Sequence, residues 1–123
     1  MKQSSFTLVT GGASGIGAAC VSHLIDIGHN VLVMDLPHSQ SVCHEKASGF
    51  LACDVTDEQA LKSKLQEIET RFGPVDCLVN SAGILQNRLP PDQLSMSEWE
   101  RVLNVDFRGT YLCCTFFGHA MVK

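Results

Sequence analysis

The sequence lacks several features that would place it in a well-marked class. None of the apolar runs in its 123 residues approaches the roughly 18 residues of a membrane-spanning helix. Its nine lysines and arginines are scattered along the chain, and the formal net charge is −4. Nucleic acids and anionic membranes are bound through clustered basic residues, so we predict neither as a partner.

The six cysteines show no pairing or metal-binding pattern. No two of them are spaced as C-x-x-C, and most lie in apolar stretches. His38, Cys43 and His44 are close in sequence but fit no zinc-ligand spacing. Residues 1–5 are too few to form a signal peptide before the first apolar run. We therefore predict free thiols, no metal site and a cytoplasmic location.

Short apolar runs alternate with helical patterns along the chain. The apolar runs, which predict strands, occupy residues 6–9, 31–34, 50–53 and 75–79. Four helices are predicted. The first begins near Ile16 and ends before Gly28, and the second carries the stripe of Leu61, Leu65, Ile68 and Phe72. The third covers residues 95–103, and the fourth runs from Phe107 to Lys123. The stretch 38–48 is expected to hold at most a short helix. This alternation predicts one α/β domain over residues 1–123, with helices on both faces of a parallel sheet.

Two tetrapeptides have the composition of a capping box, in which a side-chain oxygen at the helix start bonds an amide three residues later. In the first, Thr56 to Gln59, the threonine is the expected cap residue. In the second, Ser95 to Glu98, the serine is expected to cap the next helix.

A glycine-rich loop, T-G-G-A-S-G-I-G at 10–17, joins the first strand to the first helix. Glycine permits a tight turn and the close approach of a ligand to the backbone. The free amides at the start of the helix can then hold a phosphate without any basic side chain. We therefore predict a pyrophosphate site at Gly11, Ser14, Gly15, Ile16 and Gly17. A glycine-rich turn without a ligand is the alternative.

The spacing T-G-x-x-x-G-I-G resembles that of the short-chain dehydrogenase/reductase family. Three later segments resemble the family in the same order: C-D-V at 53–55, L-V-N-S-A-G at 78–83, and W-E-R-V-L-N-V-D-F-R-G-T at 99–110. The resemblance implies a Rossmann-like, doubly wound α/β fold with sheet order 3-2-1-4. It also implies hydride transfer between NAD and a carbonyl or secondary alcohol. G-G-A-S-G followed by D-L-P is most similar to the 3-hydroxyacyl-CoA and hydroxysteroid dehydrogenase branch.

Asp35, at the end of the second strand, is expected to decide which nicotinamide cofactor is bound. A carboxylate there accepts hydrogen bonds from both adenosine ribose hydroxyls and repels a 2′-phosphate. Ser14 and Leu36 occupy positions where NADP-dependent relatives often carry a basic residue. We therefore predict NAD (NADH) as the cofactor and NADP as disfavoured. A plain turn carboxylate before Pro37 is the alternative.

The resemblance assigns two further clusters to the cofactor. It places Cys53, Asp54 and Val55 at the adenine, and it places Asn80, Ser81, Ala82 and Gly83 beside the two riboses. Asp54 could instead serve a helix cap or turn, and 80–83 could be only a tight strand-to-loop turn. A response-regulator receiver, in which Asp54 would accept phosphate, is disfavoured. Its magnesium ligands would follow the first strand, where this chain has glycines.

The match to the family breaks at its catalytic residues. Asp106 occupies the position of the family's catalytic Asn and would add a charge there. The family reaction also needs an upstream Ser and a Tyr-x-x-x-Lys pair. The single tyrosine, Tyr111, is followed four residues later by Thr115, and its apolar neighbours predict packing. We therefore expect an NAD-binding portion that is inactive by itself; a nucleotide-binding or dimer-interfering fragment is the alternative.

The resemblance also predicts a sheet that stops early. The family's sheet continues with three strands beyond the one at 75–79, so this strand is expected to form an exposed apolar edge. The Phe107–Lys123 helix resembles the family's subunit-contact helix. We therefore expect a homo-oligomer through this helix, and marginal folding of the 123 residues alone.

Overall fold

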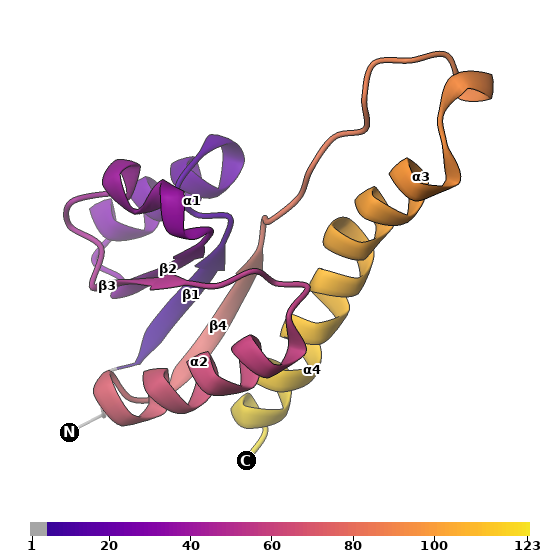
Figure 1. The fold of residues 1–123 in the computed structure, drawn as a ribbon. Coiled ribbons are helices and arrows are strands. Elements are labelled where there is room, and N and C mark those ends of the chain that lie inside the picture. The colour runs from indigo at the N-terminus through magenta and orange to yellow at the C-terminus, as the bar shows by residue number, and fades with distance from the viewer. Residues whose placement is uncertain (1–4) are drawn as a thin grey trace.

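The structure is a computed structural model that describes residues 5–123 (Figure 1). The predicted absence of a leader peptide concerns residues 1–5, of which 1–4 lie outside the described residues. The strands are β1 (Phe6–Thr10), β2 (Val31–Asp35), β3 (Gly49–Ala52) and β4 (Val75–Asn80). They form one parallel sheet in the order β3-β2-β1-β4, as predicted.

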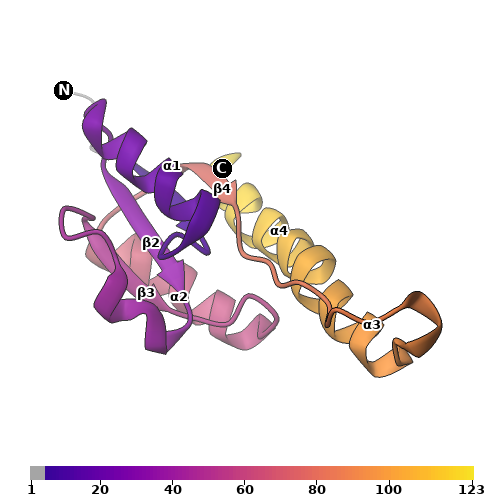
Figure 2. The same cartoon turned by 90° about the horizontal axis from the view of Figure 1, so that it is seen from above.

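Helices cover both faces of this sheet, as Figures 1 and 2 show. Helix α1 (Gly15–Asp26) packs on one face, and α2 (Glu58–Arg71) and α4 (Thr110–Met121) pack on the other. No helix in the part of the chain that the structure describes is both long and apolar enough to cross a membrane.

The central strands are buried on both faces because successive side chains of a strand point to opposite sides. In β2, Val31 and Val33 pack towards α1, whereas Leu32 and Met34 pack towards α2 and α4. All four side chains are almost completely buried. The unbroken apolar run at 31–34 therefore belongs to a strand that is covered on both faces, as predicted.

Helix α1 buries a different face from the predicted one. Ile16 was expected in the apolar stripe, but its side chain is 80% exposed. The buried positions are Gly17 and Val21. Gly17 lies so close to the glycine loop that a Cβ there would collide with the carbonyl of Gly11. The face that carries Gly17 also carries Val21, and Leu24 and Ile25 pack beside this valine.

The cap of α2 also differs from the prediction. Asp57, not Thr56, is the cap residue, and its carboxylate accepts the amide of Ala60 at 3.0 Å. Thr56 instead bonds Asp54 through both its amide and its hydroxyl. The next predicted cap is confirmed, since Ser95 Oγ accepts the amide of Glu98 at 3.1 Å. The stretch 38–48 contains a short 3₁₀ helix, η1 (Pro37–Val42).

The connection from β4 to α4 forms an arm, here defined as residues 83–109, which projects away from the sheet (Figure 1). It contains a 3₁₀ turn, η2 (Pro91–Gln93), helix α3 (Met96–Leu103) and a π-helical turn, η3 (Asn104–Gly109). The predicted helix start at Phe107 is therefore wrong, because α3, η3 and α4 form one helical run.

The root of this helical run is packed tightly, whereas its outer side is open. Gly109 is buried, and a Cβ at this position would lie 2.5 Å from Cγ2 of Val55. Tyr111 was expected to be packed, but it is 63% exposed. Its helix touches the sheet with the face that carries Leu112, Cys113 and Phe117, so the tyrosine points outwards.

Candidate functional site

The glycine loop brings the start of α1 to the carboxyl end of β1. Gly11 has φ 62°, and a Cβ there would lie 2.7 Å from the backbone of Ala82. Gly15 has φ 56° and faces open space. No side chain caps α1, and its first turn holds no acidic residue. The first amides of the helix are therefore available to an anion.

Asp35 is held in one orientation at the end of β2. Its Oδ2 accepts the amide of Ala13 at 3.1 Å, and its Oδ1 accepts the amide of Leu36 at 2.8 Å. These contacts join β2 to the glycine loop. Each carboxylate oxygen retains a free lone pair, so Asp35 can still accept hydrogen bonds from a ligand hydroxyl.

The residues after β3 form a second wall of the site. Asp54 Oδ1 accepts the amide of Thr56 at 2.9 Å and its hydroxyl at 2.8 Å, so the alternative turn function is present in the structure. Cys53 and Val55 on either side are buried. Burial raises the pKa of the Cys53 thiol to about 11, so this residue is a neutral, apolar part of the wall. All six cysteines are free, as predicted.

Thr10, the last residue of β1, holds the segment that follows β4 below the site. Its buried Oγ1 accepts the amides of Ser81 and Ala82, each at 3.2 Å. The hydroxyl thereby fixes the point where the chain leaves β4. Thr10 was not among the predicted site residues, although its place before the glycines was a usable signal.

Asp106, on the π turn, contacts the loop after β4. Its Oδ1 accepts the amide of Ile84 at 2.8 Å and lies 3.3 Å from where a Cβ on Gly83 would be. Its backbone carbonyl accepts the hydroxyl of Thr110 at 3.0 Å. The side chain thus holds main chain at the rim of the site, a function that an Asn oxygen could also perform.

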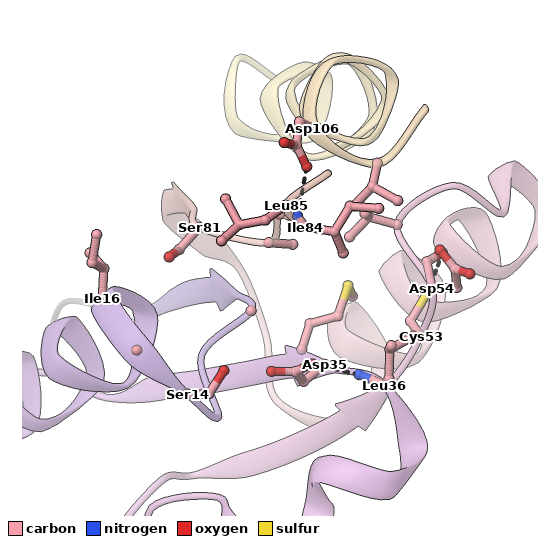
Figure 3. A pocket seen from close by; sticks show the side chains of 17 residues that line it. Ser14, Ile16, Asp35, Leu36, Cys53, Asp54, Ser81, Ile84, Leu85 and Asp106 are labelled. Atoms are coloured by element: carbon pink, nitrogen blue, oxygen red, sulfur yellow. Dashed lines mark hydrogen bonds between the residues drawn. The ribbon is translucent and has the colours of Figure 1, made fainter. Parts of the chain in front are cut away.

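These elements enclose one cavity of about 600 Å³ at the carboxyl edge of the sheet (Figure 3). Thirteen predicted residues line it: Gly11, Ser14, Gly15, Ile16, Asp35, Leu36, Cys53, Asp54, Val55, Ser81, Ala82, Gly83 and Asp106. Four further lining residues were not predicted: Met34, Ile84, Leu85 and Val105. Their apolar side chains carry no signal that separates them from the core.

Two predicted site residues are not part of the cavity lining. Gly17 lies beneath the loop against Gly11. The amide of Asn80 donates to the sulfur of Cys114 at 3.3 Å, which directs it towards α4. Their assignment to the cofactor stays a prediction.

Residues 5–123 match the family model described as short chain dehydrogenase. The chain is 34% identical to D-threitol dehydrogenase of Mycolicibacterium smegmatis, over 94% of this chain and 47% of that protein. It is 34% identical to 3-hydroxyacyl-CoA dehydrogenase type-2 of Bos taurus, over 85% of this chain and 43% of that protein. A crystal structure named as ribose-5-phosphate isomerase from Brucella melitensis 16M is 39% identical, with a TM-score of 0.88, over 98% of this chain and 47% of that one.

The chain belongs to the short-chain dehydrogenase family, whose members are oxidoreductases that use nicotinamide dinucleotides. The resemblance seen in the sequence motifs is thereby confirmed, as is the Rossmann-like fold. The chain spans about half the length of the curated relatives it matches. The names of these proteins give different activities, so the comparisons establish the family and the fold but no substrate.

Proposed function

We propose that residues 1–123 are a cofactor-binding domain that prefers NAD(H) over NADP(H), within an NAD-dependent dehydrogenase acting on a carbonyl or secondary alcohol. The observation that carries this proposal is the charge of the cavity. Among residues 5–123, its lining includes Asp35, Asp54 and Asp106 but no lysine or arginine. A 2′-phosphate would meet carboxylates there without any cation to offset them.

The described residues fit a dinucleotide at both of its anchoring points. The uncapped amides of α1 and the open side of Gly15 suit the pyrophosphate. Asp35, oriented by Ala13 and Leu36, would accept hydrogen bonds from the adenosine ribose. When bound, the nicotinamide supplies the hydride acceptor or donor. The residues of this chain would bind and orient the dinucleotide, with Val55 as an apolar wall beside the adenine.

Calorimetry with NADH and NADPH tests the cofactor preference. We expect NADH to bind at least tenfold more tightly than NADPH to the parent chain. Asp35→Ala should lose most of this preference, because it removes both the ribose acceptor and the charge that repels the phosphate. Asp76→Ala is the matched control, since Asp76 is an exposed carboxylate on β4 outside the cavity. An Asp35→Ala variant that kept the full preference would contradict the proposal.

A binding protein without turnover is the second candidate, and one observation favours it. Tyr111 is the only tyrosine and has Thr115 four residues on, so the family's Tyr-x-x-x-Lys is not in these 123 residues. We expect this chain to bind NADH without oxidising threitol or a 3-hydroxyacyl thioester in the presence of NAD. Turnover by the purified chain, followed at the absorbance of NADH, would exclude this candidate.

We also propose self-association through residues 107–123 and a cytoplasmic location. The exposed aromatic residues Phe107 and Tyr111 support the first proposal, and the six free thiols support the second. Light scattering should then show a species of at least twice the 13.4 kDa chain mass. Tyr111→Glu should shift it towards the monomer.

A further inference from the structure

One segment of the arm is held by side chains of the helix beside it. This strap, defined as residues 84–87, follows β4 and runs along α3 and the π turn (Figure 1). It has no strand partner for its backbone groups. Three of those groups instead bond side chains of the helical run.

The three contacts form a ladder. Asp106 accepts the amide of Ile84 at 2.8 Å, Arg101 Nη2 donates to the carbonyl of Leu85 at 3.2 Å, and Glu98 Oε1 accepts the amide of Asn87 at 2.9 Å. The contacts run in opposite chain directions, so the strap and the helix lie antiparallel.

Two of the ladder residues also hold each other. Arg101 forms a two-pronged pair with Glu98, with Nη2 2.7 Å from Oε1 and Nε 3.0 Å from Oε2. The Glu98 side chain is only 11% exposed, because it lies between the arginine and the strap. Fork-shaped pairing of this kind fixes the orientation of both side chains as well as attracting them.

The π turn explains how Asp106 reaches the strap. In an α-helix, positions 98 and 101 share a face that continues at 105. A π turn adds one residue to the helical repeat, and here it covers Asn104–Gly109. Val105 accordingly packs against the core, and Asp106 takes the next place on the strap side.

The strap forms one end of the cavity. Ile84 and Leu85 line it together with Gly83 and Asp106. In Figure 3, Ile84, Leu85 and Asp106 lie across the cavity from Asp35 and Leu36. Under the proposed function, Asp35 and Asp54 take the adenosine half of the dinucleotide. The strap then borders the half beyond the pyrophosphate.

We propose that Glu98, Arg101 and Asp106 are positioning residues that clamp the strap and thereby set how tightly the nicotinamide half of the dinucleotide is held. This inference rests on the proposed function. It assigns the three side chains no contact with the reacting atoms; they act through the backbone of Ile84, Leu85 and Asn87.

The test compares a whole dinucleotide with half of one. Calorimetry with NADH and with ADP is carried out on the full chain and on Arg101→Met. This variant removes the contact to the Leu85 carbonyl and frees Glu98, which bonds the Asn87 amide. We expect NADH affinity to fall about five- to twentyfold and ADP affinity to stay within twofold. Hydrogen exchange at the amides of Ile84 and Asn87 should accelerate at least tenfold.

Two further variants separate positioning from general stability. Arg71→Met is the matched control, because Arg71 pairs with Glu67 on the exposed side of α2, away from the cavity. It should change neither affinity. Asp106→Asn keeps an acceptor oxygen and should retain NADH affinity, whereas Asp106→Leu should lose it.

The outcomes distinguish this inference from the proposed function. A parent chain that binds neither NADH nor ADP refutes the proposed function. The proposed effect of Glu98, Arg101 and Asp106 on cofactor affinity is then refuted as well. A parent that binds both, with an Arg101→Met variant that loses both equally or neither, refutes the clamp alone. Unchanged hydrogen exchange in the strap refutes it as well.

Discussion

The sheet and the arm are stabilised in different ways. The sheet is buried on both faces by α1, α2 and α4, and its central side chains are apolar. The arm exposes Leu85, Trp99 and Phe107, and its strap is held by polar side chains on main-chain atoms. Burial gives the first region stability from many contacts, whereas the second depends on a few directional ones. The arm is therefore the part that single polar substitutions can loosen without unfolding the domain.

The largest expected effect is the difference in the free energy of unfolding when leucine is replaced by alanine in the sheet and in the arm. Leu32→Ala removes a completely buried side chain of β2 and should lower the free energy of unfolding by about 2–5 kcal/mol. Leu85→Ala acts on a side chain that is 85% exposed and should change it by no more than about 0.5 kcal/mol. Urea unfolding monitored by circular dichroism measures both. Equal losses would mean that the arm is packed as the sheet is.

The same glycine-to-alanine change should have opposite effects on stability at Gly15 in the site and at Gly118 in α4. Gly15→Ala forces a side chain onto φ 56° and should cost about 1–2 kcal/mol of stability and weaken NADH binding. Gly118→Ala places a methyl group in open space within α4 and should stabilise by about 0.5–1 kcal/mol. Thermal unfolding with and without NADH reports both effects. Stabilisation by Gly15→Ala would show that the loop does not need its left-handed conformation.

Substitutions at the cap of α2 should lower the stability by a smaller amount, with the greater loss at Asp57. Asp57→Ala removes the acceptor for the Ala60 amide and should cost about 1 kcal/mol. Thr56→Ala loses only the hydroxyl contact to Asp54 and should cost less. Denaturant midpoints of the two variants decide the order. The reverse order would restore Thr56 as the cap.

Acid should release the strap before it unfolds the sheet. Arg101 and the Asn87 amide lower the pKa of Glu98 from 4.5 to about 2. A lowered carboxyl pKa contributes stability that is complete above 4.5 and is lost as the pH falls towards 2. Nuclear magnetic resonance should show the Asn87 amide shifting in that window. Glu98→Gln should abolish the shift, and its persistence in that variant would assign the titration to another carboxylate.

The sequence predicts the sheet well because its signals are local. Unbroken apolar runs such as 31–34 indicate strands covered on both sides, and Gly28 adopts φ 93° after α1 as a helix-ending glycine does. Asp35 follows directly from its place at a strand end. Twelve of the thirteen predicted residues that line the cavity lie at or beside the loops that leave the carboxyl edge of the sheet, and the exception, Asp106, lies on the π turn.

The arm could not be predicted in the same way, because its contacts join residues far apart in sequence. Nothing at Ile84 indicates that Asp106, 22 residues later, accepts its amide. The π turn ends at Gly109, which packs against Val55, and helix periodicity gives no sign of this contact. The rotation of α1 was missed for a related reason. The buried face includes Gly17, whose backbone lies against Gly11, and a glycine adds nothing to an apolar stripe.

The contact of Gly109 with Val55 has a mechanical consequence. No side chain separates the helix backbone from this valine, which is also a wall of the cavity. A side chain at position 109 would therefore have to displace Val55, and the change would reach the shape of the cavity although Gly109 itself does not line it.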